Sequence, residues 1–391
     1  MIFPLKSKAL LERLFSIFSK ELNHHRIFGL DILRCFAIIT VIIDHGKFIF
    51  PQKIIKIHNY IRFDGVSIFF VLSGFLIGGI LIKQLETNKA SFKLLLNFWI
   101  KRWFRTLPTY FLILSILVVC YNIQDPSFSF NKIKSYYLFC QNLFYPTSEY
   151  FPESWSLSVE EWFYLIIPFL IFSLIVLLKL SPKNSIIIIA FFTLSFVSFL
   201  RYYYPYMHGT LIKAGDFHHQ VVYRLDSMMY GIIGAYINYY YAKYWKMAAT
   251  KLFVCGLLVF IIHRYIYINN IFPSPIGLYN VVLEYSIISF GTLLLLPFLS
   301  NLEKVKYKIA NIVTILSLIS YSMYLIHMTF VKDMILKSIP WTSFTTNYNI
   351  IIPVFYFLYW SLTIVLSAII FKTFETPMTN LRNKVVSDKQ Y

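Results

Sequence analysis

The chain has 391 residues, of which 58% are hydrophobic and 14% are charged, and its formal net charge is +18. Soluble domains carry about 25% charged residues, so this composition excludes an ordinary soluble domain. The apolar residues form runs close to the ~20 residues that a membrane-spanning helix needs, without the alternation of barrel strands. We predict an all-α, polytopic membrane protein, in which the excess of Lys and Arg marks cytoplasmic loops rather than a nucleic-acid partner.

The predicted elements begin with a helix on the membrane surface. Residues 1–26 carry apolar side chains at helical spacing among lysines and arginines, which is typical of an interfacial amphipathic segment. Residues 27–376 form the predicted membrane-embedded domain, and residues 377–391 a cytoplasmic tail. The short apolar stretch 133–146 is either a re-entrant or an interfacial helix. About ten spans are predicted, near residues 28–50, 65–85, 103–122, 156–179, 184–204, 220–242, 252–272, 277–300, 310–332 and 348–372.

The distribution of basic residues predicts the orientation. Lys and Arg are denser in the segments that lie on the same side as the N-terminus, such as residues 83–105. Because basic loops stay in the cytoplasm, we predict that both termini are cytoplasmic and that the protein is a multi-pass protein of the inner (cytoplasmic) membrane, surrounded by its lipids. The four cysteines lack metal-ligand spacing, so no metal site is predicted.

The first predicted span contains two ionisable side chains. Their presence needs an explanation, because placing each one at bilayer depth costs about 2.5–3.5 kcal/mol. Arg34 and His45 are 11 residues apart. At ~100° and 1.5 Å per residue, they share one helix face about 16 Å apart. Asp31 lies one turn before Arg34 and could simply neutralise it, and His45 could be an ordinary hydrogen-bonding group. The functional hypothesis is a catalytic imidazole at His45.

Two further arginines lie near the start of the third predicted span. Arg102 and Arg105 are one turn apart and share a helix face. Basic residues next to tryptophans commonly anchor a helix at the membrane interface. Guanidinium groups also match phosphate oxygens, so the alternative is a phosphate-binding clamp.

Acidic residues open the fourth predicted span. Ser158 and Glu161 have the spacing of a capping box, which accounts for Glu161 without any catalytic role. Glu160 is not needed for the box, and we predict that it orients an imidazole or accepts a proton.

The remaining motifs favour packing. The glycines and serines of residues 64–79 are typical of close helix contacts. Arg224, Asp226 and His327 are interpreted as members of buried polar networks.

Taken in order, these segments resemble the acyltransferase 3 family of integral-membrane acyltransferases that modify surface glycans. The resemblance extends from residue 27 to about 382. It rests on GLDILRCFAIITVIIDHG, FDGVSIFFVLSGFLI, RWFRTLPTYF with its R-x-x-R element, WSLSVEEWFYLIIP, YRLDSMMYGIIGA, ISYSMYLIH and FETP. Each motif alone is weak, but the ordered set is specific.

The resemblance implies about ten helices and the transfer of an acyl group, usually acetyl from acetyl-CoA, to a carbohydrate hydroxyl. Carried over, His45 is the leading catalytic candidate, and Arg34, Arg102 and Arg105 are linked to the acyl-CoA donor. The acceptor would be a surface carbohydrate or lipid-linked glycan, such as the O-antigen of lipopolysaccharide or a capsule. Two alternatives remain: a transporter of a lipid-linked glycan or small anion, and a scaffold subunit of an envelope complex.

Overall fold

The computed structural model describes residues 16–22, 26–47, 50–144, 149–208, 218–272, 278–303 and 308–385. Within these ranges it is a bundle of helices with no β-strand, as the sequence predicts. The predicted interfacial segment 1–26 lies mostly outside the described residues. The long helices are α3 (Phe28–Gly46), α5 (Gly65–Thr87), α6 (Phe92–Gln124), α8 (Trp155–Leu177), α9 (Pro182–His208), α11 (Leu225–Tyr240), α13 (Ala249–Ile268), α14 (Glu284–Leu299), α15 (Lys308–Ile326) and α17 (Tyr348–Ile370).

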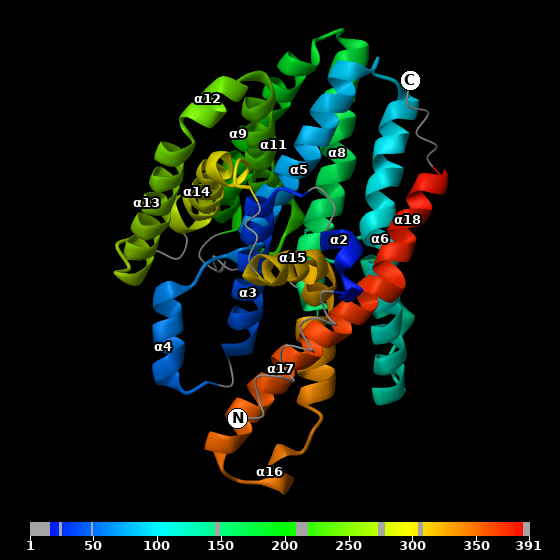
Figure 1. Cartoon of the computed structure of the whole chain (residues 1–391), viewed down its shortest axis with the longest axis vertical. Coiled ribbons are helices and arrows are strands. Elements are labelled where there is room, and N and C mark those ends of the chain that lie inside the picture. The colour runs from blue at the N-terminus through cyan, green and yellow to red at the C-terminus, as the bar shows by residue number, and fades with distance from the viewer. Residues whose placement is uncertain are drawn as a thin grey trace.

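Shorter elements connect or extend the long helices. They are α2 (Ser19–Leu22), α4 (Gln52–Ile61), η2 (Phe130–Lys132), α7 (Lys134–Tyr137), η3 (Pro152–Ser154), η5 (Val221–Tyr223), α12 (Ala242–Met247), η6 (Tyr279–Leu283), η7 (His327–Leu336), α16 (Trp341–Phe344), η8 (Phe371–Glu375) and α18 (Thr376–Val385). In Figure 1, α5, α6 and α8 follow the long axis, and α15 and α17 lie obliquely to them. Helix α12 is at one end of the molecule, whereas α4 and α16 are at the other.

Eight helical segments within the described ranges are long and apolar enough to cross a membrane. They contain all of the long helices except α3 and α11. Helix α3 has 19 residues but carries three charges, and α11 has 16 residues. The protein is therefore an all-α polytopic membrane protein, and the count of ten spans and the cytoplasmic termini stay predictions.

Three local predictions differ from the structure. The third span begins at Phe92, so Arg102 and Arg105 lie three turns inside α6 rather than at its start. The stretch 133–146 contains only the four-residue helix α7 in its described part. No capping box forms: α8 begins at Trp155, and Ser158 instead accepts a hydrogen bond of 2.6 Å from Gln141.

Glycines bring α5 and α11 into backbone contact, as the small residues of 64–79 predict. A Cβ atom at Gly74 would collide with the carbonyl oxygen of Met228, and one at Gly231 with that of Val71. The N-terminus of α5 is capped by Asp64, whose carboxylate accepts from two backbone N–H groups at 3.1 Å. This packing holds α5 in place as one wall of the cavity described in the next subsection.

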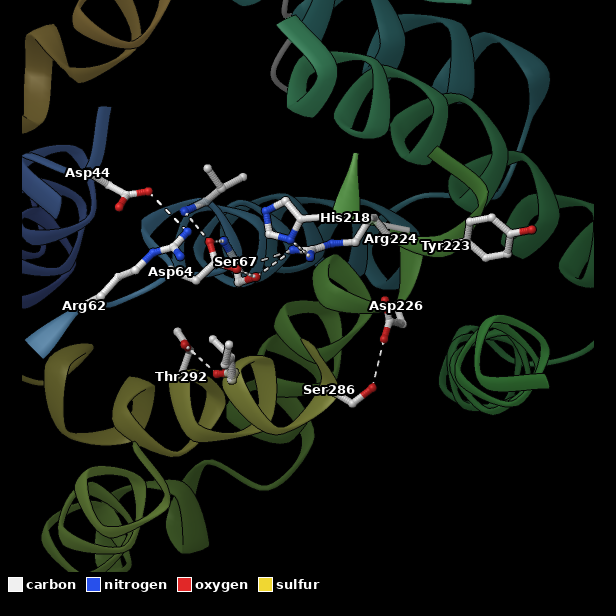
Figure 2. Close-up of polar contacts among 12 residues, drawn as sticks. Asp44, Arg62, Asp64, Ser67, His218, Tyr223, Arg224, Asp226, Ser286 and Thr292 are labelled. Atoms are coloured by element: carbon white, nitrogen blue, oxygen red, sulfur yellow. Dashed lines mark hydrogen bonds and ion pairs between the residues drawn. The ribbon is translucent and has the colours of Figure 1, made fainter. Parts of the chain in front are cut away.

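A buried ion pair and a hydrogen bond join α9, α11 and α14. Arg201 of α9 and Asp226 of α11 are at most 1% exposed, and their nearest charged atoms lie 2.6 Å apart. Ser286 of α14 donates to the second carboxylate oxygen at 3.1 Å (Figure 2). Asp226 is thus a network residue, as its sequence context predicts.

Candidate active site

A cavity of about 140 Å³ brings together four of the five predicted site residues, and we call it the arginine cavity. The four come from α3, α6 and α8, which are far apart in the sequence. They are Arg34, Arg102, Arg105 and Glu160. Ser156 and Tyr324 also line it. The structure therefore places the cations of the first and third predicted spans in one space, as a shared function requires.

Arg102 is held in place by polar contacts to α8. Its Nη2 donates to Glu160 Oε2 at 2.9 Å and to the hydroxyl oxygen of Tyr164 at 2.7 Å. The hydroxyl of Tyr164 donates in turn to Glu160 Oε2 at 2.9 Å, and its ring lies 4.2 Å below the guanidinium carbon. The carboxylate of Glu160 thus faces Arg102 and Tyr164, and its predicted catalytic role stays a prediction.

Arg34 is held by a second cluster. Its Nη1 donates to Ser317 of α15 at 3.1 Å and lies 3.6 Å from Asp31, so the predicted one-turn pair is present. Asp31 is shared, since Arg26 also binds it at 2.5 Å. Sequence reasoning missed Arg26 because it assigned that residue to the surface segment. Two arginines around one buried carboxylate leave this side of the cavity with a net positive charge.

Arg105 differs from the other two arginines. It is exposed, and it makes no hydrogen bond or ion pair within the described part of the chain. Its positive charge repels that of Arg34 electrostatically. A guanidinium with five unused N–H donors beside other cations is well suited to an anionic ligand.

His45 is paired with another histidine. Its Nδ1 lies 2.7 Å from Nε2 of His327, the first residue of η7, and the two ring planes are 19° from parallel. His327 is completely buried, and its Nδ1 lies 2.8 Å from the carbonyl oxygen of Tyr324. Because a carbonyl can only accept, we assign the proton of a neutral His327 to Nδ1. Its Nε2 must then accept from His45, which leaves the lone pair of the half-buried His45 on Nε2.

Tyr324 connects the histidine pair to the arginine cavity. Its ring contacts His327 at a centroid distance of 5.8 Å, and its hydroxyl accepts from Ser156 at 2.7 Å inside the cavity. His45 itself is not among the described residues that line the cavity. His45 is therefore connected to the cavity through two residues, His327 and Tyr324.

Sequence reasoning noted His327 but did not pair it with His45. The two residues are 282 positions apart, and no spacing rule connects them. The shared face of Arg34 and His45 is confirmed, because both contact the segment formed by α15 and η7.

Residues 27–372 match the family described as "Acyltransferase domain" (Acyl_transf_3). The chain belongs to this acyltransferase family. Among relatives of this Acyl_transf_3 chain, the peptidoglycan O-acetyltransferase OatA of Listeria monocytogenes is 34% identical over 155 residues, which cover 36% of this chain and 23% of that protein. O-acetyltransferase OatA of Staphylococcus aureus is 28% identical over 382 residues, which cover 90% of this chain and 57% of that protein. The Acyl_transf_3 chain thus spans little more than half the length of the second relative. No solved structure matches it.

Proposed function

We propose that this protein is a membrane-bound O-acetyltransferase that moves an acetyl group from acetyl-CoA to a hydroxyl of a cell-wall or other surface glycan. The observation that carries the proposal is the arginine cavity, which Tyr324 connects to a histidine pair with a free imidazole nitrogen. Family membership and relatives named for peptidoglycan O-acetylation support the reaction type and the class of acceptor.

The arginine cavity suits the phosphates or the thioester end of acetyl-CoA. Arg105 has free donors, whereas Arg102 and Arg34 are fixed by their own carboxylates. We therefore assign the first contact with the anionic donor to Arg105, and a fixed positive field to the other two. A volume of about 140 Å³ is below the ~300–1,000 Å³ of typical ligand pockets, so donor binding requires the lining side chains to move.

His45 supplies the base in this proposal. Its Nε2 takes the proton of the sugar hydroxyl as that oxygen attacks the thioester carbonyl. The carbon–sulfur bond then breaks, and the imidazolium returns the proton to the thiolate, which leaves as free CoA. The same lone pair could instead attack the thioester and carry the acetyl group to the sugar in a second step. In both routes His327 is a positioning residue, because it fixes the tautomer.

The test uses the purified chain with acetyl-CoA labelled in the acetyl group and a soluble glycan acceptor. The proposal expects free CoA thiol and labelled glycan in equal amounts. A transporter, the alternative activity, would move its cargo across vesicle membranes without releasing thiol. Intact acetyl-CoA after incubation with acceptors that related enzymes acetylate would refute the proposal.

A further inference from the structure

A second polar cavity is lined by residues of α13, η6 and α14 and of the segment that leads into α5. It has a volume of about 580 Å³, within the range of ~300–1,000 Å³ that is typical of ligand sites. We call it the α13 cavity, because the C-terminal part of α13 forms one wall. The residues that matter here are Arg62, Asp64, His218, Arg264, Tyr267 and Glu284.

We propose that the α13 cavity binds an uncharged saccharide unit of the acceptor glycan. The inference rests on the proposed function and names the place where its second substrate is held. Three properties of the cavity support it: unused hydrogen-bonding groups of both kinds, balanced charge and an aromatic rim.

The unused polar groups comprise an acceptor and two donors. Glu284 makes no hydrogen bond or ion pair with any residue that the structure describes. Arg264 donates its Nε–H to the carbonyl oxygen of Tyr60 at 3.1 Å, and its guanidinium lies 4.7 Å from the centre of the Tyr267 ring; its other N–H groups make no hydrogen bond with the described residues. His218 accepts from Arg224 at 3.4 Å through Nδ1, so a neutral ring carries its proton on Nε2. A carboxylate, a guanidinium and an imidazole N–H are the partners that vicinal hydroxyl groups need, since each hydroxyl both donates and accepts.

The charges balance, which argues against an anionic ligand. Arg62 is paired with Asp44 at 3.2 Å, and Asp64 accepts from Ser67 and faces Arg224 (Figure 2). This leaves one cation and one carboxylate, Arg264 and Glu284, to face a ligand. The arginine cavity is instead lined by three arginines and two glutamates, Glu160 and Glu375, so cations are in excess there. The charge of each cavity therefore suits one substrate: the arginine cavity suits the anionic donor, and the α13 cavity suits the neutral acceptor.

The rim of the α13 cavity is aromatic and accessible. Tyr267 is 47% exposed and Phe272 is 48% exposed, and both line the cavity. The C–H faces of a pyranose ring pack on such rings, while its hydroxyl edge reaches polar groups deeper in the site. If Tyr267 and Phe272 only faced lipid, we would not expect polar groups without hydrogen-bond partners to lie behind them.

The position of the cavity fits a substrate of His45. Arg62 lines it and binds Asp44, the residue directly before His45 in α3. Helix α4, which leads to Arg62, is at the end of the molecule opposite α12 (Figure 1). In the predicted orientation that end faces outward, so a surface glycan would enter there and the donor from the cytoplasmic side.

The test measures binding independently of turnover. Chitotetraose, cellotetraose and mannotetraose are titrated into the detergent-solubilised chain by calorimetry and saturation-transfer NMR. We expect at least one to bind the wild-type protein, and Glu284→Gln and Tyr267→Ala each to weaken its affinity about tenfold or more. Matched controls are Glu86→Gln and Tyr244→Ala, which change exposed residues outside the cavity and leave affinity unchanged. Since Tyr267 is half exposed, its truncation remains informative if Glu284→Gln fails to fold.

Kinetics separate this inference from the proposed function. The same two variants should raise the KM for the saccharide about tenfold, with the KM for acetyl-CoA unchanged. If the wild-type protein binds the saccharide but releases no CoA thiol, the proposed function fails and the saccharide site stands. If none of the three saccharides binds, if both variants bind like wild type, or if inorganic phosphate displaces the saccharide, the α13 cavity is not a saccharide site.

Discussion

Replacing His327 by phenylalanine removes the hydrogen-bond acceptor of His45 while keeping a planar ring in the same space. In the structure that bond is 2.7 Å long. A hydrogen bond of this kind contributes about 0.5–1.5 kcal/mol, and a donor left unsatisfied costs about 1–3 kcal/mol. At 1.36 kcal/mol per factor of ten, we expect kcat/KM for acetyl transfer to fall about tenfold. His45→Ala removes the base itself and should cost about 10²–10⁴.

The double variant His45→Ala/His327→Phe gives the sharpest result. If His327 acts only by positioning His45, the double variant should be as slow as His45→Ala alone, because the second change has nothing left to position. The assay is CoA thiol release at saturating acceptor, normalised to folded protein by size-exclusion chromatography. His58→Phe on α4, outside both cavities, is the matched control. Independent, multiplicative losses would refute the reasoning, as would wild-type activity of His327→Phe.

Three further outcomes are expected. Arg105→Ala should raise the KM for acetyl-CoA about tenfold with little change in the fold. Lys93→Ala, which changes an exposed lysine of the same helix, should leave this KM unchanged. Equal KM values for the two variants would contradict a donor contact at Arg105. Gly74→Leu should separate α5 from α11 and lower the thermal midpoint in detergent by several degrees. Gly79→Ala should leave the thermal midpoint unchanged, because a Cβ atom at Gly79 meets nothing within 4 Å. Asp226→Ala should cost about 3–5 kcal/mol of stability because it leaves a buried guanidinium unpaired; a thermal midpoint equal to wild type would show that water solvates that charge.

The sequence predicted the fold class and the residues that meet in the arginine cavity. It could do so because a membrane enforces long apolar helices and makes each embedded charge conspicuous. Helical periodicity also placed Arg34 and His45 on one face, since that relation is local to a single helix. The cavity itself was implied only by the resemblance to known acyltransferases.

The partners of these residues could not be predicted in the same way. Glu160 faces Arg102, and His45 faces His327, because of how separate helices pack, and that packing leaves no periodic trace in the chain. The length of α6 was also underestimated. The basic residues Lys101, Arg102 and Arg105 follow the largely apolar residues 92–100, so the sequence places the start of the span after that stretch rather than at Phe92.

The contacts of α3 have a consequence for biosynthesis. Arg34 and His45 meet partners that are 283 and 282 residues further along the chain. At about 5–20 residues per second of translation, α3 waits roughly 15–55 s before those partners are synthesised. During that interval His45 lacks its final partner and Arg34 has only Asp31 of its own helix, so we expect α3 to stay at the insertion machinery or at a lipid–water boundary. Nascent chains that stop before α15 would therefore be recognisable to membrane quality control by this first helix.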